Sequence, residues 1–448
     1  MNSFLSKYLF YYPVTIARGE FVLMRLLQYK RMQWRNASDI EAYQLSNLNK
    51  LIKYAILNCP YYRQLLGDNG IALSGIKNIS DLERIPTITK TDLVNYYSTI
   101  RSDRRFLFSS SKTTGGSTGE AVTVEKNAGA LARERAATWR AYEWAGVGIG
   151  DVQARFWGVP LSKKSHLLSR LVDFISNRSR LSAFQINEES LDQYHKKLLK
   201  LRPAYLYGYV SMISAFAGHL EKSNINGLPG LRSVITTSEV LDDSSRKLIE
   251  DVLQVRVFNE YGCGEVGSIA HECEYGNMHI MAENVIIEID TSSSPDGESG
   301  EIIVTDLHNY AMPLIRYRLG DYATLSKEEC ECGRGLPVIK SVHGRAYDMV
   351  VDPDGNMLHP EVLMYVFEEL KTSAAGIKQF QVIQKSIDSF LINIVPEMYY
   401  KKETEEDILG RIRNKIHPGF SAHFCYVDEI TREKSGKLRV IKSELNLH

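Results

Sequence analysis

From about residue 150 onward, short strand-like runs alternate with amphipathic helical runs, and this alternation limits the fold more than any other feature. The strand-like runs occupy residues 152–159, 204–209, 234–237, 255–259, 285–289 and 301–305. Helical patterns at residues 190–201, 211–223 and 242–253 separate several of them. Alternating strands and helices form α/β domains, whose ligands usually bind at loops that follow the strands. We therefore predict an α/β fold, with a large N-terminal domain of mixed or parallel sheets flanked by helices.

The last hundred residues follow a different pattern. A hairpin-like run at 349–358 contains the turn Asp352-Pro353-Asp354-Gly355. A helix is expected from residue 361 and another at 405–416, with strands at 379–384, 390–395 and 423–427. This pattern predicts a small α+β domain. We place the boundary near Asp348, which gives domains at residues 1–347 and 348–448.

Composition excludes several classes of partner. The chain has 54 basic and 54 acidic residues, so its charge gives no reason to expect nucleic acid as a partner. No run is long enough to span a bilayer, and the apolar stretch at residues 8–17 lacks the features of a signal peptide. We expect a cytoplasmic protein. The early stretch either packs on the domain as an aromatic segment or associates loosely with a membrane.

Residues 109–119 consist almost entirely of Ser, Thr and Gly. Such a run suits phosphate binding, because glycine lets backbone N–H groups face an anion and the hydroxyls add donors. The run does not match the Walker A pattern. A flexible surface linker has the same composition, but the strand-like residues 121–124 and the long helical pattern that follow argue against a linker.

Four further segments carry candidate chemistry, although each alone has a simple structural explanation such as a turn or a solvated charge. They are residues 259–265, with two glycines beside Glu265; 316–321, ending at Asp321; 344–348; and 435–439, which contain Lys437. In this order, together with residues 109–119, they resemble the adenylate-forming superfamily. The resemblance is closest to its phenylacetate–CoA ligase-like branch, which includes ligases found with capsular polysaccharide genes, and runs from about residue 45 to the end of the chain. Glu120, Leu319 and Tyr347 depart from the family pattern, and Glu120 lowers the positive charge expected near the phosphates.

The resemblance implies a role for each matched residue. The loop that grips the ATP phosphates corresponds to Thr113, Thr114, Gly115, Gly116, Ser117, Thr118 and Gly119. The adenine and ribose would contact Ser238, Glu239, Glu260, Tyr261, Gly262 and Asp321, and Glu265 would bind Mg²⁺. The catalytic and hinge positions correspond to Arg345, Asp348 and Lys437, with Lys437 bridging the carboxylate and the α-phosphate.

The acid pocket is expected beside the nucleotide segments, with Trp157, Tyr207 and Thr237 in its wall. The alternation of Tyr205, Tyr207 and Tyr209 is equally consistent with one face of a buried strand. The sequence identifies neither the acid nor the oligomeric state.

The activity implied by the resemblance is ATP-dependent ligation: a carboxylic acid becomes an acyl-adenylate with release of pyrophosphate, and the acyl group passes to coenzyme A. One alternative is transfer to an amine, giving an amide in surface or capsular polysaccharide biosynthesis. A second is a non-catalytic relative that binds nucleotide, against which the joint presence of Glu265, Asp321 and Lys437 argues.

The cysteines give a separate signal. His271, Cys273, Cys330 and Cys332 offer one imidazole and three thiolates, a set that matches structural Zn²⁺, and His279 is an alternative fourth ligand. Four unrelated residues are the simpler interpretation, but Cys330-Glu331-Cys332 precedes Gly-Arg-Gly and is too polar for a core. The remaining cysteines, Cys59, Cys263 and Cys425, are expected to be structural.

Overall fold

The structure is a computed structural model of the 448-residue chain. It describes residues 2–73, 75–114, 122–157, 172–182, 188–292, 297–345, 350–355, 357–358, 363, 366–367, 370, 376–398, 400–430 and 440–445. The chain divides into two compact units, the first comprising Met1–Leu319 and Ala323–Ser341, the second Gly320–Tyr322 and Val342–His448. The boundary predicted at Asp348 lies outside the described residues, and the long segment of the second unit begins six residues earlier, at Val342.

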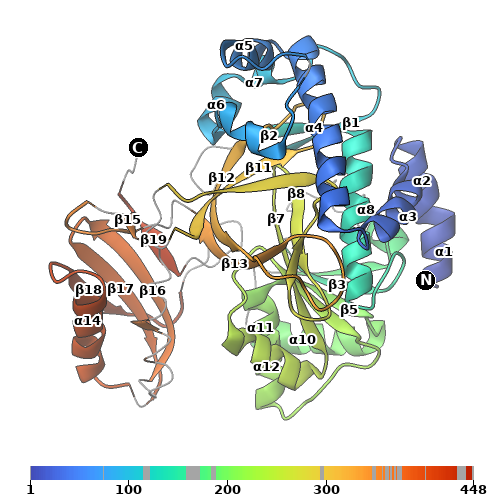
Figure 1. The fold of residues 1–448 in the computed structure, drawn as a ribbon. Helices are drawn as coiled ribbons and strands as arrows, with labels where there is room; N and C mark the ends of the chain where they lie inside the picture. The colour runs from blue at the N-terminus through green and yellow to red at the C-terminus, as the bar shows by residue number, and fades with distance from the viewer. Residues whose placement is uncertain are drawn as a thin grey trace. The chain divides into compact units, whose positions relative to one another are not determined.

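Helices dominate the first hundred residues of the first unit (Figure 1). They are α1 (Ser3–Leu5), a π-helical turn (Ser6–Tyr11), α2 (Tyr12–Ala17), α3 (Val22–Met32), α4 (Ala37–Asn58), α5 (Pro60–Asp68), a 3₁₀ turn (Ile79–Arg84), α6 (Lys90–Asn95) and α7 (Tyr97–Ile100). The side chain of Asn36 caps α4 by accepting a 2.8 Å hydrogen bond from the backbone N–H of Asp39. Pro60 stands at the first position of α5, where its missing N–H costs nothing.

A large mixed sheet forms the centre of the first unit (Figure 1). Its strand order is β10-β11-β12-β13-β9-β8-β7-β6-β5-β3-β4. The strands are β3 (Gln153–Trp157), β4 (Arg178–Ser182), β5 (Tyr205–Tyr209), β6 (Ser233–Thr237), β7 (Arg256–Cys263), β8 (Gly267–Glu272), β9 (Met278–Ile280), β10 (Val285–Asp290), β11 (Ser299–Asp306), β12 (Tyr317–Leu325) and β13 (Val338–Arg345). Strands β4, β3, β5, β6 and β7 pair in parallel, whereas β7 with β8, β8 with β9, β9 with β13 and β10 with β11 pair antiparallel.

Helices cover both faces of the parallel half. The helices α10 (Glu188–Leu201), α11 (Val210–Lys222) and α12 (Asp243–Leu253) pack through residues such as Leu198, Phe216 and Ile249 on one face. Helix α8 (Ala128–Trp144) covers the other face, where Tyr142 contacts residues of β5, β6 and β7. Alternate residues of each strand face opposite sides of the sheet, and helices pack on both sides. The α/β class predicted from the alternation of strands and helices is therefore confirmed.

A separate hairpin precedes α8. Strands β1 (Ser109–Thr114) and β2 (Val122–Asn127) pair antiparallel with Thr113 opposite Thr123 and Thr114 opposite Val122. The first part of the Ser/Thr/Gly run therefore forms β1. Residues Gly115–Gly119 of the predicted phosphate loop lie outside the described residues.

The second unit has its own core. Its elements are β14 (Val350–Val351), β15 (Met357–Leu358), β16 (Ile377–Ser386), β17 (Ser389–Pro396), α14 (Glu403–Lys415), β18 (Ser421–Tyr426) and β19 (Ile441–Ser443). The sheet order is β18-β17-β16-β19, and Ile408 and Ile412 of α14 pack against strand residues such as Phe390 and Ile392. The hairpin predicted at 349–358 appears as the antiparallel pair β14–β15. Together with the four-stranded sheet and α14, it confirms the predicted α+β class of the small domain.

Candidate functional site

The loop after β6 and the end of β7 hold the residues expected to contact the adenine. Ser238 follows β6 with φ = 68°, a left-handed conformation that turns the chain sharply out of the sheet. The carboxylate of Glu239 accepts hydrogen bonds from the backbone N–H of Ser211 at 2.7 Å and from its Oγ at 2.9 Å. Because Ser211 lies in the first turn of α11, Glu239 satisfies a helix donor and fixes the β6 loop against that helix.

Strand β7 carries Glu260, Tyr261 and Gly262 beside that loop, with Glu260 paired in register with Thr237 of β6. Glu260 Oε2 accepts a 2.9 Å hydrogen bond from the hydroxyl of Tyr142 on α8. Removal from water raises the pKa of Glu260. The structure thus brings together Thr237, from the expected acid pocket, and Glu260, from the expected adenine segment.

Glu265 lies half-buried in the tight turn that joins β7 to β8. Glycine is required on both sides of this turn. A Cβ on Gly262 would come within 2.4 Å of the Gly267 carbonyl oxygen, and a Cβ on Gly267, whose φ is 95°, within 2.3 Å of the Glu134 carboxyl carbon. The two glycines therefore let the strands and α8 close tightly around the residue proposed to bind Mg²⁺.

The buried ammonium group of Lys126 stabilises the same turn. Lys126 Nζ, at the end of β2, donates to the Val266 carbonyl oxygen at 2.5 Å and pairs with Glu134 Oε2 at 2.7 Å. Asp306 Oδ2 lies 3.9 Å from the same nitrogen. Although burial opposes it, the attraction of these two carboxylates raises the pKa of Lys126, so this lysine is charged at neutral pH. Sequence reasoning missed Lys126 as a support of Glu265, because only the fold brings β2 beside this turn.

Aromatic side chains and one arginine line the sheet next to Glu260. The rings of Trp157 and Tyr209 stack with centroids 4.6 Å apart, and Trp157 and Tyr207 are 5.8 Å apart. The guanidinium carbon of Arg155 lies 4.3 Å from the Trp157 ring and 4.8 Å from the Tyr207 ring. The sequence did not single out Arg155, although its spacing of two from Trp157 places both side chains on one face of β3.

The tyrosines of β5 combine both predicted roles. Tyr205 is 1 % exposed and belongs to the core beneath α8, as expected for one face of a buried strand. Tyr207 is 9 % exposed, touches Arg155 and lies 6.2 Å from Tyr142 between ring centroids. Tyr207 thus borders both the core and the group of residues around Glu260.

Several expected residues are described only in part. Asp321 lies in β12 and is 5 % exposed. Thr113 and Thr114 end β1, and the backbone of Arg345 ends β13. Asp348 and Lys437 lie outside the described residues, so their hinge and catalytic roles stay predictions.

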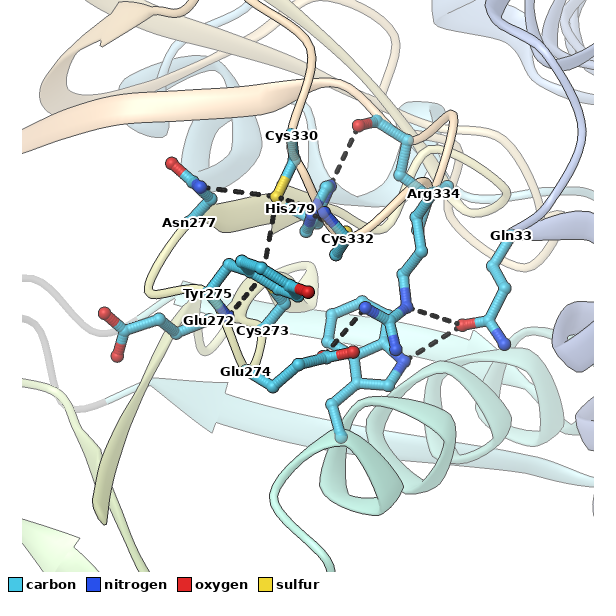
Figure 2. A network of polar contacts seen from close by, with 12 residues as sticks. Gln33, Glu272, Cys273, Glu274, Tyr275, Asn277, His279, Cys330, Cys332 and Arg334 are labelled. Carbon is cyan, nitrogen blue, oxygen red and sulfur yellow. Dashed lines mark hydrogen bonds and ion pairs between the residues drawn. The ribbon is translucent and has the colours of Figure 1, made fainter.

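The second constellation gathers three thiols and one imidazole between β8, β9 and a later loop (Figure 2). The ligand atoms of Cys273, His279, Cys330 and Cys332 all lie within 4.8 Å of one another. The Sγ atoms of Cys273 and Cys330 are 3.7 Å apart, and His279 Nε2 lies 3.2 Å from Cys332 Sγ. These separations resemble the edges of a tetrahedron around Zn²⁺, which are about 3.8 Å between sulfurs for Zn–S bonds of ~2.3 Å. The chemistry and spacing of these donors therefore fit zinc.

Neighbouring groups orient the four ligands (Figure 2). His279 Nδ1 lies 2.9 Å from the Leu336 carbonyl oxygen, which favours the tautomer that leaves the Nε2 lone pair free for a metal. Asn277 Nδ2 donates to Cys330 Sγ at 3.3 Å, and the backbone N–H of Cys332 donates to the same sulfur at 3.5 Å. Such donors stabilise a thiolate, and although burial opposes them, they lower the pKa of Cys330.

The structure corrects the histidine of this set. His271 was the first choice, but its ring packs between Tyr142, at 5.6 Å, and Trp144, at 6.2 Å, and it does not join the cluster. His271 Nδ1 lies 2.9 Å from the carbonyl oxygen of Glu272. Opposite residues of an antiparallel pair share a face, so His271 and His279 lie side by side, but β9 is next to β13 in the sheet and β8 is one strand further away. His279 is therefore the histidine that joins the Cys330 loop.

Comparisons with known proteins show which sequences and folds this chain resembles. A family model described as the CapK C-terminal domain matches residues 350–444. Protein CapK of Staphylococcus aureus is 25 % identical over 422 residues, covering 90 % of this chain and 89 % of the relative. A crystal structure of 2-hydroxyisobutyryl-CoA ligase in the postadenylation state has the same fold, with a TM-score of 0.71 at 18 % identity over 92 % of this chain and 91 % of that one. The chain therefore has the fold of this acyl-CoA ligase, and its sequence resembles CapK.

The sequence is also similar to phenylacetate–CoA ligases. The phenylacetate-coenzyme A ligase of Thermus thermophilus is 27 % identical over 331 residues, covering 70 % of this chain and 72 % of the ligase. The resemblance to phenylacetate–CoA ligases and capsular ligases that the order of the sequence segments indicated is therefore confirmed.

Proposed function

We propose that the chain is an ATP-dependent ligase that activates a carboxylic acid and transfers its acyl group to the thiol of coenzyme A. In the first step, a carboxylate oxygen attacks the α-phosphorus of ATP, and the bond to pyrophosphate breaks. In the second, the thiolate sulfur attacks the acyl carbon, and AMP leaves. Ligases of both the phenylacetate and the 2-hydroxyisobutyrate type are similar to this chain.

The observation that carries the proposal is the Glu265 turn, because two glycines and a buried lysine are needed to fix the position of this residue. Two glycines that tolerate no side chain close the turn, and the buried Lys126 binds its backbone. The Glu265 carboxylate would hold Mg²⁺, which would neutralise phosphate charge as the carboxylate approaches. Asp321 would accept hydrogen bonds from the ribose hydroxyls, and Ser238 and Glu260–Gly262 would border the adenine.

Lys437 completes the proposed adenylation site. Its ammonium group would neutralise the two anions that meet when the carboxylate attacks, and a rotation of the small domain at Asp348 would then withdraw it. This gives the thiol access to the acyl carbon.

The acid is proposed to bind against Trp157 and Tyr207. Stacked rings favour a flat acyl group, and the Arg155 guanidinium at 4.3 Å from Trp157 favours a π-system or an anion over a bulky aliphatic chain. Aryl acids therefore head the substrates to test.

The experiment is pyrophosphate release by the full-length protein over a panel of aryl, fatty, amino and uronic acids, with and without coenzyme A. We expect one class of acid to give release, and AMP formation in multiple turnovers to require coenzyme A. An amine acceptor in place of the thiol would instead give AMP and an amide without coenzyme A. Absence of exchange between ATP and pyrophosphate with every acid would overturn the proposal in favour of a non-catalytic relative.

Glu265→Gln provides the matched variant, since the amide keeps the size of the side chain while removing its charge. We expect the Mg²⁺ concentration for half-maximal activity to rise by about tenfold or more, the effect of losing a charged oxygen ligand. Glu188→Gln, at an exposed position in the first turn of α10, is the control and should leave the Mg²⁺ dependence unchanged.

A further inference from the structure

The first 35 residues present an unusual surface. Of the twenty-five large apolar side chains that are exposed among the described residues, eleven lie between Phe4 and Trp34. Seven of them are at least half exposed: Phe4 (63 %), Leu9 (61 %), Ile16 (54 %), Phe21 (55 %), Met24 (54 %), Leu27 (50 %) and Trp34 (55 %). Such clustering far exceeds the scatter of single apolar residues on ordinary surfaces and marks an interaction site.

In this segment some polar side chains are buried and many apolar side chains are exposed, which is the reverse of the usual pattern. Ser6 and Thr15 are buried at 1 % and 5 % exposure, and their hydroxyls donate to the carbonyl oxygens of Ile175 and Tyr12. The apolar residues around them face outward instead. In α3, Val22, Leu26 and Tyr29 form the inner face against the domain, so the outer face with Phe21, Met24 and Leu27 is a second apolar surface rather than a misplaced core.

The same segment is strongly basic. Residues 2–35 contain six basic residues and one acidic residue, a formal charge of +5, although the whole chain has a formal charge of zero. The single acid, Glu20, is 1 % exposed and is already bound by Arg18 and Arg135. The outward-facing charges, such as those of Arg31 and Arg35, are therefore positive.

The segment is fixed to the first unit rather than loosely attached. Figure 1 shows α1, α2 and α3 on the outer side of α8. Trp139 Nε1 of α8 donates to the Tyr11 hydroxyl at 2.7 Å, and a Cβ on Gly150 would lie 2.3 Å from the Ser3 carbonyl oxygen. A Cβ on Gly19 would lie 2.8 Å from the ring of Phe108, which is itself 46 % exposed and follows the exposed Arg104 and Arg105. A second basic and aromatic loop thus extends the surface.

We propose that this surface, formed by residues 2–35, docks the chain on an anionic lipid membrane. Exposed aromatic and aliphatic side chains interspersed with Lys and Arg are the composition of helices that lie in the plane of a membrane interface. The apolar side chains enter the boundary between headgroups and acyl chains, and the net charge of +5 is attracted to anionic headgroups. No helix among the described residues is both long enough and apolar enough to cross a bilayer.

A second copy of the chain fits this surface less well. Pairing two copies through the same face would bring two sets of positive charges together with no exposed acid in the segment to neutralise them. The lipid surface supplies the opposite charge and requires no shape complementarity.

The test is flotation of the full-length protein with vesicles of phosphatidylcholine alone and of phosphatidylcholine with phosphatidylglycerol. We expect flotation with the anionic vesicles, little with the neutral ones, and loss of binding at about 1 M salt, where the screening length falls to ~3 Å. The double variant Leu9→Glu/Met24→Glu should lower the bound fraction by about tenfold or more, because both side chains are exposed and each change adds a negative charge.

Two controls carry the same change elsewhere. Leu199→Glu on α10 and Met398→Glu before α14 alter side chains that are 42 % and 106 % exposed, and each should float like the unchanged protein. Pyrophosphate release by all variants separates this proposal from the proposed ligase activity. The proposal is overturned if the unchanged protein stays unbound with anionic vesicles, if the double variant floats equally well, or if that variant instead splits a dimer of a protein that does not bind vesicles.

Discussion

The metal cluster allows a paired substitution that distinguishes its two candidate histidines. We expect His279→Ala to remove zinc from the protein, whereas His271→Ala should retain it. Both histidines are fully buried, so the two variants create cavities of the same size in neighbouring strands. Only His279 has a ring nitrogen, Nε2, within 3.2 Å of a cluster sulfur, and its Nδ1 is already committed to Leu336.

The geometry also indicates how much zinc affinity the His279→Ala variant should lose. With Zn–S bonds of ~2.3 Å and a Zn–N bond of ~2.0 Å, a tetrahedral site has edges of about 3.8 Å between sulfurs and about 3.5 Å from sulfur to nitrogen. The separations of 3.7 Å and 3.2 Å are within a few tenths of an ångström of these values, so the ligands need little movement to bind. Losing a direct ligand should cost more than the ~10–100-fold in affinity typical of losing a group that only orients one.

The assay is zinc content by elemental analysis after dialysis, combined with X-ray absorption of the zinc-loaded protein. We expect about one zinc per chain in the unchanged protein and in His271→Ala, and three sulfurs with one nitrogen in the absorption spectrum. Zinc retained by His279→Ala and lost from His271→Ala would refute the assignment, as would a protein that holds no zinc at all. Circular dichroism of both variants separates metal loss from general unfolding.

Three further outcomes are expected. Lys437→Ala should slow pyrophosphate release by about 10²–10³-fold, while thioester formation from a supplied acyl-adenylate should continue, and near-normal adenylation would refute the role of this lysine. Gly267→Ala should destabilise the first unit by about 2 kcal/mol or more, because alanine at φ = 95° is strained and its Cβ would displace the Glu134 carboxylate; an unchanged urea midpoint would contradict this. Burial lowers the pKa of His308 to about 3, below the ~6.5 of the unfolded chain, so between these values the unfolded state binds more protons and stability should fall as pH decreases. His308→Gln should flatten the pH dependence of the unfolding free energy by about 1.4 kcal/mol per pH unit between ~4 and ~6, and a slope equal to that of the unchanged protein would count against this reasoning.

The parallel half of the large sheet was predictable because its strands are short apolar runs separated by amphipathic helices. The predicted strands at 204–209 and 234–237 correspond to β5 (Tyr205–Tyr209) and β6 (Ser233–Thr237). The antiparallel half was not recognised as sheet in several places. Strand β9, at Met278–Ile280, has three residues, too few for a pattern of alternation to show.

The candidate site was predictable to different degrees. Glu265 and Glu260 could be found because glycines and a strand end surround them in the sequence. Lys126 and Arg155 could not, since each acts through contacts with residues distant in the chain, Val266 for Lys126 and Tyr207 for Arg155. The choice between His271 and His279 depended on strand register, which spacing alone does not determine.

Strand β8 joins the two constellations. It starts at Gly267, two residues after Glu265, and ends at Glu272, next to Cys273. This strand of six residues thus connects the proposed Mg²⁺ site at one end with the cluster of Cys273, His279, Cys330 and Cys332 at the other. Loss of zinc would free the Cys273 end of β8, so we expect acid activation to depend on zinc content even though the ligand side chains lie outside the proposed nucleotide site.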